Sequence, residues 1–329
     1  RRARIEQANE HLHVLHRYFR LRARMMGVTD MCYWDIYPPL VSGELSFPIE
    51  RGKELVLDAM IPLGPEARQS IAEGFSARWM DVYPRQGKKS GAYMNGHVYD
   101  VHPYVLMNYN DDYESVSTLA HEWGHALHSH LTNQSQHFVN ADYSIFVAEV
   151  ASTLNEALLL HRMLEESTSP SERLFYLGHA LEQLRGTFFR QSMFAEFELA
   201  IHERVEGGEA LTAEDFSELY GELIRRYHGH ADGVVDIDEI FHLEWAYIPH
   251  FYYNFYVYQY ATSVAAASYL AEQILDGAPG ATEAYLDLLR AGGAGYPYDL
   301  LVKAGVDLAG PEPYRALMRR MGRIMDEIE

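Results

Sequence analysis

Two histidines four residues apart, with a glutamate between them, constrain this chain more than any other feature. They are His121, Glu122 and His125 in the stretch TLAHEWGHALH. The flanking residues predict a buried helix, being apolar at Val116, Leu119, Ala120, Ala126 and Leu127. Residues four apart share one helix face, so both imidazoles can bind one metal ion with the glutamate beside them. A solvent-exposed histidine pair is the alternative, but burying these groups without compensation would be costly.

The motif predicts one zinc ion, and a catalytic zinc needs a third protein ligand and an open position for water. Glu149 is the candidate, because it interrupts the apolar and small-residue stretch 146–156 on a second expected helix. The intervening loop is long enough for that helix to run back alongside the first. A glutamate on the helix surface is the alternative. Glu156 is interpreted as a group that orients a ligating imidazole, with a surface position as its equal alternative.

The composition narrows the class of protein. Hydrophobic residues make up 48% and charged residues 22%, which is typical of a soluble globular protein. The formal net charge of -20 argues against nucleic acid as a partner. The single cysteine, Cys32, excludes a thiolate zinc site and suits a cytoplasmic location. No apolar run approaches the roughly 18 residues of a membrane span, so we expect no membrane partner.

Helical periodicity runs through most of the chain. It predicts helices over 3–27, 50–61, 64–80, 113–131, 143–167, 172–206, 212–228, 252–277, 282–291 and 311–328. Residues 87–109, rich in Gly, Tyr and Val, predict two or three strands joined by turns. The expected fold class is therefore mostly α with one small β-sheet. The run from Gly229 to Gly233 is the nearest feature to a hinge.

The wider sequence resembles the M3 family of metallopeptidases, specifically the oligoendopeptidase F branch, which is related to thimet oligopeptidase. The likeness rests on HEWGHALH and FVAEVASTLNE, and extends over YWDIYPPLV, SGAYMNGHVYDVHPYVLMNY, IPHFYYNFYVYQYATS and AGGAGYPYDLLVKAGVDL. It implies a helical zincin fold that lines a deep channel and hydrolysis of short peptides. It also implies that His121, His125 and Glu149 hold the zinc, with Glu122 as general base.

Members of this branch carry a long N-terminal region that supplies one wall of the channel. The resemblance therefore implies that residues 1–329 form a single bilobed catalytic domain from which this region is absent. The region is an expected partner, whether in the same polypeptide or supplied separately. We expect weak or no turnover from residues 1–329 alone, because a substrate held about 1 Å from its productive pose loses on the order of 100-fold in rate.

Hydrolysis also needs a donor to the oxyanion, and the segment 250–256 offers one. His250, Tyr253 and Tyr256 are the candidates, although with 24 tyrosines in the chain most must be structural. Only the resemblance raises this segment above ordinary packing.

A loop and a strand are candidates for holding the peptide. The loop Gly91, Ala92 and Tyr93 would close over a peptide that pairs with an edge strand at 103–109. An ordinary hairpin is the alternative for this region.

Other histidines carry weaker hypotheses. His228 and His230 with Asp232 form a possible second metal site, but a Gly-flanked loop is the preferred interpretation. His128 is expected to pack the site. His97 and His102 flank the expected strands and could touch substrate.

These features predict a zinc-dependent endopeptidase that acts on oligopeptides. Glu122 favours an enzyme over a zinc-stabilised helical peptide-binding module, because a structural site gains nothing from a carboxylate at that position. A zinc carboxypeptidase is a third possibility. It would need a cationic group for the substrate carboxylate, which cannot be assigned among Arg185, Arg190 and Lys303.

Overall fold

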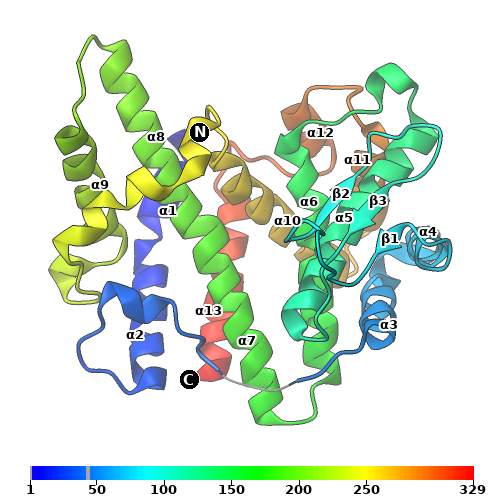
Figure 1. Ribbon diagram of the computed structural model, residues 1–329, viewed down its shortest axis with the longest axis horizontal. Coiled ribbons are helices and arrows are strands. Elements are labelled where there is room, and N and C mark those ends of the chain that lie inside the picture. Colours follow the sequence, from blue (N-terminus) through cyan, green and yellow to red (C-terminus); the bar gives the residue numbers. More distant parts are fainter. Residues whose placement is uncertain (1, 42–44) are drawn as a thin grey trace. The chain divides into compact units, whose positions relative to one another are not determined.

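Apolar residues three and four apart form helices through most of the chain, as the sequence predicts (Figure 1). The structure is a computed structural model that describes residues 2–41 and 45–329. The α-helices are α1 (Arg2–Glu10), α2 (Leu12–Met26), α3 (Ile49–Ala59), α4 (Gly64–Ser76), α5 (Tyr113–Ser135), α6 (Ile145–Glu166), α7 (Pro170–Leu184), α8 (Gln191–Glu206), α9 (Ala213–Tyr227), α10 (Tyr258–Leu275), α11 (Ala281–Ala291), α12 (Pro297–Lys303) and α13 (Glu312–Ile328). The predicted fold class, mostly α with one small sheet, is confirmed.

Three short strands form the sheet: β1 (Met80–Asp81), β2 (Tyr93–Asn95) and β3 (Tyr104–Leu106). Strand β3 lies in the centre, parallel to β1 and antiparallel to β2. The prediction of an edge strand at 103–109 is therefore wrong. Strand β3 pairs with β2 along one edge and with β1 along the other. The first residue of β1, Met80, is the last residue of the segment predicted as helix 64–80. The edge strand that follows the Gly91–Tyr93 loop is β2.

Several predicted helices are interrupted. The first divides at His11, between α1 and α2, and residues Arg185–Arg190 form a π-helical turn between α7 and α8. The helix predicted over 252–277 begins only at Tyr258. Before it, Phe255 adopts a positive φ of 54°, which breaks helical geometry.

The chain divides into two compact units. Among the described residues, unit 1 contains 2–41, 177–262 and 309–329, and unit 2 contains 45–176 and 263–308. The segment Gly229–Gly233 lies inside unit 1, where His230–Asp232 forms a 3-10 turn between two glycines with positive φ. This segment is therefore not where the units join.

Unit 2 is built around α5 and α6. Trp123 of α5 is fully buried and packs against Phe75 of α4, with a ring-centroid distance of 4.3 Å. At Gly74, a Cβ atom would come within 2.6 Å of the Trp123 ring, so only glycine lets α4 approach this closely. This packing fixes the helix that carries the histidine motif.

Unit 1 contains a polar cluster around Glu244. Its carboxylate accepts hydrogen bonds from Tyr33 and Tyr220 at 3.0 and 2.7 Å, and pairs with Arg190. Burial, followed by the Glu244 charge, raises the pKa of Tyr33, so the phenol stays protonated and donates. The cluster joins residues far apart in sequence.

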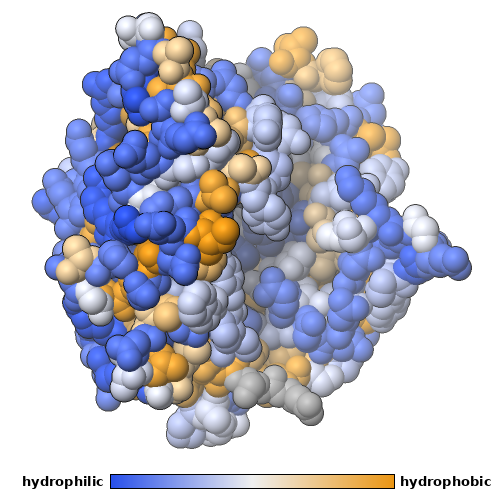
Figure 2. All heavy atoms as spheres, turned by 60° about the vertical axis from the view of Figure 1, so that its left-hand side comes forward, coloured by the Kyte–Doolittle hydropathy of each residue, from blue (hydrophilic) through white to orange (hydrophobic). Residues whose placement is uncertain are grey.

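The exposed surface is mostly hydrophilic on the face drawn in Figure 2. Apolar side chains are scattered among the hydrophilic ones. Among the described residues, none of the helices combines the length and apolar character that would let it cross a membrane.

Candidate metal and active site

Helix α5 carries the histidine motif and begins at a capped N-terminus. The side chain of Asp112 accepts a hydrogen bond from the Ser115 N–H at 2.8 Å, which satisfies one of the free donors of the first turn. The predicted burial of this helix is confirmed. Its flanking apolar residues are at most 2% exposed, namely Val116, Leu119, Ala120, Ala126 and Leu127.

Helix α6 runs antiparallel to α5. Ser117 contacts Glu156, His121 contacts Glu149, and further along α5 the hydroxyl of Ser129 contacts Tyr143, just before α6. As the residue numbers increase along α5, those of their contact partners decrease, which is the pattern of two antiparallel helices. The expected return of the second helix alongside the first is confirmed.

Gly124 permits the close approach of these helices. A Cβ atom on Gly124 would lie 2.6 Å from the Cα of Ser152 and 2.7 Å from the carbonyl oxygen of Ala151. Both neighbours are backbone atoms, so they cannot rotate away. Asn155 adds a second link, because its amide donates to the carbonyl oxygen of Ala120 at 3.2 Å.

We expect Gly124→Ala to lower the free energy of unfolding by about 1–3 kcal/mol, because the added methyl group forces the two helices apart. The matched control is Gly322→Ala in α13, where the added Cβ meets no atom within 4 Å apart from the neighbouring backbone of its own helix. That change should be neutral or stabilise by up to about 1 kcal/mol. Urea unfolding of both variants checks the prediction, and equal effects would contradict it.

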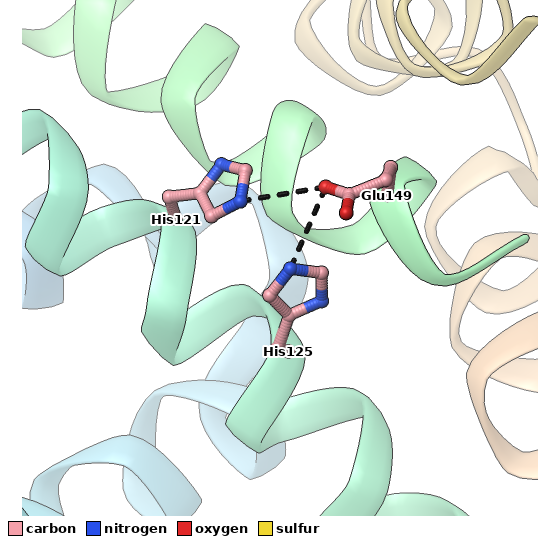
Figure 3. A group of neighbouring side chains, drawn as sticks. All are labelled: His121, His125 and Glu149. Carbon is pink, nitrogen blue, oxygen red and sulfur yellow. Dashed lines mark ion pairs between the residues drawn. The ribbon is translucent and has the colours of Figure 1, made fainter. Parts of the chain in front are cut away.

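His121, His125 and Glu149 converge on one point (Figure 3). Glu149 Oε2 lies 3.4 Å from His121 Nε2 and 3.5 Å from His125 Nε2. One ligand atom from each residue lies within 4.8 Å of the other two. The side chains are 13–28% exposed, so the group is partly shielded yet accessible.

This spacing fits a zinc ion. In tetrahedral coordination with bonds of about 2.0–2.1 Å, ligand atoms lie about 3.4 Å apart, which matches both separations from Glu149. Two imidazoles and one carboxylate are also a donor set that catalytic zinc uses. The residues present therefore fit the metal.

The charges within the group are mutually stabilising. Burial works against ionisation of Glu149, but its contacts with both histidines outweigh this and hold its pKa well below the usual range. Burial alone would lower the pKa of His121, yet contacts with Glu156 and Glu149 raise it. A cation held here would likewise stabilise the negative charge of the Glu149 carboxylate.

Glu122 lies beside the group but outside the set of converging ligands. The residue is 6% exposed, and this burial raises the pKa of its carboxyl. The histidines and the backbone N–H of Met94 in β2 act in the opposite direction. A raised pKa makes the carboxylate a better proton acceptor.

Neighbouring polar groups orient the ligands. Glu156 Oε2 lies 3.5 Å from His121 Nδ1, the ring nitrogen that points away from Glu149. Ser152 donates to Glu149 Oε2 at 3.0 Å. Sequence reasoning singled out Glu156 but missed Ser152, whose signal is its place one turn after Glu149 on the same helix.

The loop Gly91–Tyr93 leads directly into edge strand β2. Asn108 holds it, since its amide donates to the carbonyl oxygens of Lys89 and Gly91 at 2.9 and 2.7 Å. Gly91 has a φ of 83°, which favours glycine. Sequence reasoning missed Asn108, and the role of the loop in substrate binding stays a prediction.

His250, Tyr253 and Tyr256 lie in unit 1, whereas His121, His125 and Glu149, which we call the metal group, lie in unit 2. They do not share a helix: Pro249–Tyr252 is a 3-10 turn and Tyr253 follows it. The rings of His250 and Tyr256 are nearly parallel, with centroids 5.7 Å apart, and the Tyr256 hydroxyl lies 2.8 Å from that of Tyr260. Their role as oxyanion donors stays a prediction.

The remaining histidines have other surroundings. His128 is buried and stacks on Tyr143 with centroids 3.6 Å apart, and His102 stacks on Trp79. His228 is buried against Phe19, and His230 accepts a hydrogen bond from the backbone of Ile237. His228, His230 and Asp232 are not among the described residues whose ligand atoms converge, which agrees with the preferred interpretation of a Gly-flanked loop.

The arginines considered for a carboxypeptidase are engaged elsewhere. Arg185 pairs with Glu182 at 3.0 Å, and Arg190 pairs with Glu244. Both guanidinium groups are therefore paired with carboxylates of the chain itself, which does not favour either of them as the group that binds a substrate carboxylate.

Two antiparallel helices bring two histidines and a glutamate together beside a second buried glutamate, and this set of residues fits the ligands and the base that a zinc hydrolase needs. The comparisons with known proteins narrow this class. The chain belongs to peptidase family M3, whose sequence profile matches residues 2–320. The resemblance stated from the motifs is thereby confirmed.

Individual relatives match this chain over almost its whole length. Oligopeptidase PepF of Bacillus subtilis is 45% identical over 326 residues, which is 99% of this chain and 48% of that protein. The crystal structure of oligoendopeptidase-F from Enterococcus faecium has a TM-score of 0.75 at 34% identity, covering 99% of this chain and 51% of that one. A solved structure from Chlamydophila abortus has a TM-score of 0.90 at 38% identity, covering 98% and 54%. This chain thus spans about half the length of these relatives.

Proposed function

We propose that this chain carries the catalytic centre of a zinc-dependent endopeptidase that hydrolyses oligopeptides. The observation that carries the proposal is the convergence of His121, His125 and Glu149 with Glu122 beside them. Membership of peptidase family M3 and the similarity to oligoendopeptidase F proteins support the substrate class.

His121, His125 and Glu149 would hold the zinc, with Glu156 orienting His121 through its other ring nitrogen. When bound, zinc supplies Lewis-acid chemistry, which polarises the scissile carbonyl and lowers the pKa of water to about 7. Glu122 accepts a proton from the attacking water at its carboxylate and passes it to the nitrogen of the leaving amine.

The substrate would lie along β2. An edge strand offers unpaired backbone groups to an extended peptide, so binding by main-chain hydrogen bonds tolerates many side chains. Gly91, Ala92 and Tyr93 would contact this peptide. Tyr256, with Tyr253 and His250, would donate to the developing oxyanion.

Removal of the metal tests the proposal. We expect one zinc per chain by metal analysis, and cleavage of an internally quenched peptide that a chelator abolishes and zinc restores, while magnesium does not. The assay is run with the chain alone and with the part of Oligopeptidase PepF that the chain does not match. Turnover that survives complete zinc removal, or no turnover in either assay, would contradict the proposal.

A further inference from the structure

A cavity of about 300 Å³ lies beside the metal group in unit 2. His125 is part of its lining, together with Ser129 from the next turn of α5. The rest of the lining comes from β2 and the residues just after it, and from residues 141–148. At the lower end of the size range of small-molecule sites, this volume suits one side chain and not a whole peptide.

Small residues keep this cavity open. Gly96, Ala141 and Ala148 all line it. A Cβ atom on Gly96 would lie 2.1 Å from the hydroxyl oxygen of Ser129, so the backbone there approaches α5 as closely as a glycine allows. Ala148 lies one residue before Glu149 on α6. A larger side chain at Ala148 would therefore occupy space next to the metal group.

Part of the lining is held rigidly. The Tyr143 hydroxyl lies 2.8 Å from that of Ser129, and the Tyr143 ring stacks on His128 with an interplanar angle of 12°. The hydroxyls of Ser129 and Tyr143 already form a hydrogen bond with each other, so an incoming side chain need not supply a polar partner for them. The cavity is thus formed before any ligand enters.

The charges of the lining disfavour an anion. Asp142 is its one carboxylate, and it contains no lysine or arginine. Asp142 Oδ1 lies 3.9 Å from His97 Nδ1. Met94 and Ile145 add apolar surface. An acidic side chain would meet repulsion here, whereas a bulky apolar one would be removed from water.

We propose that this cavity is a specificity subsite that takes a bulky apolar or aromatic side chain from one of the two residues flanking the scissile bond. The proposal rests on the proposed function, because a peptide bond attacked at the metal group brings its neighbouring side chains beside His125. The cavity then selects among peptides that the main-chain contacts of β2 accept equally.

The test uses phosphinic dipeptide analogues, in which PO₂–CH₂ replaces the scissile CO–NH, with Phe, Ala or Glu on either side. Their affinity for the zinc-loaded chain is measured by calorimetry, so the readout does not require turnover. We expect Phe on one side, but not on the other, to bind about ten- to hundred-fold more tightly than Ala. Glu at that position should bind more weakly than Ala.

Ala148→Leu should abolish the preference for Phe over Ala, because the leucine fills the cavity. The matched control is Ala72→Leu on α4, at a part-buried position in a different surface groove, which should retain the preference. Equal affinity for Phe and Ala analogues in the wild type, or an unchanged preference in Ala148→Leu, would overturn the subsite. Cleavage of an all-Ala peptide by the wild type tests the proposed function separately.

Discussion

Replacement of Glu122 by glutamine is expected to lower kcat by about 100- to 10,000-fold while one zinc remains bound per chain. Glutamine keeps the shape of the side chain but cannot accept the proton of the attacking water. Glu122 lies outside the group of converging ligands, so the metal should stay. Zinc analysis and turnover of an internally quenched peptide, measured on the same preparation, check both halves of the prediction.

Glu114→Gln is the matched control for this variant. Glu114 lies on the exposed side of the same helix, two turns before Glu122, and the change removes the same charge. It should leave kcat within about two-fold of the wild type. Comparable turnover in the wild type and Glu122→Gln would refute the role of Glu122 as general base.

The sequence predicts that His121, His125 and Glu149 converge because this convergence depends on local periodicity. His121 and His125 share a helix face at any tertiary packing, and the apolar surroundings of Glu149 indicate that its carboxylate points inward. The antiparallel return of α6 follows from a loop of ordinary length between two helices. What remained unseen is how closely the helices pack, which Gly124 determines through contact with the backbone of α6.

The sheet was harder to predict than the helices. Strand β1 has two residues, and these follow a helical segment with no change of composition. Pairing partners across a sheet are non-local, so a sequence pattern cannot tell which strand takes the centre. Strand β3 was therefore predicted at the edge. The structure instead places β2 at an edge, where the backbone N–H of Met94 meets the carboxylate of Glu122.

The tyrosine-rich segment shows a second limit. Its spacing favours a helix, but the backbone N–H of Phe255 donates to the buried carboxylate of Glu198 at 2.7 Å. This hydrogen bond stabilises a left-handed residue at the turn before α10. The two residues are far apart in sequence, and no local signal predicts their contact.

Loss of a zinc ligand is the second large effect that we expect, and Glu149→Ala measures it. Without the carboxylate, two imidazoles remain, and a site with two protein ligands should not retain stoichiometric zinc through gel filtration. His121→Ala and His125→Ala should behave in the same way. Circular dichroism shows whether each variant keeps its helices, which separates loss of a ligand from loss of the fold.

The decisive comparison is with Glu156→Ala, because Glu149 and Glu156 lie on the same helix and both contact His121. Glu156 faces Nδ1, on the side of the ring away from the ligand cluster, so its removal should weaken zinc binding by about 10- to 100-fold without abolishing it. Glu149→Ala should weaken zinc binding considerably more than Glu156→Ala does. If Glu149→Ala keeps one tightly bound zinc while Glu156→Ala loses it, then the third ligand is Glu156, and His121 binds the metal through Nδ1.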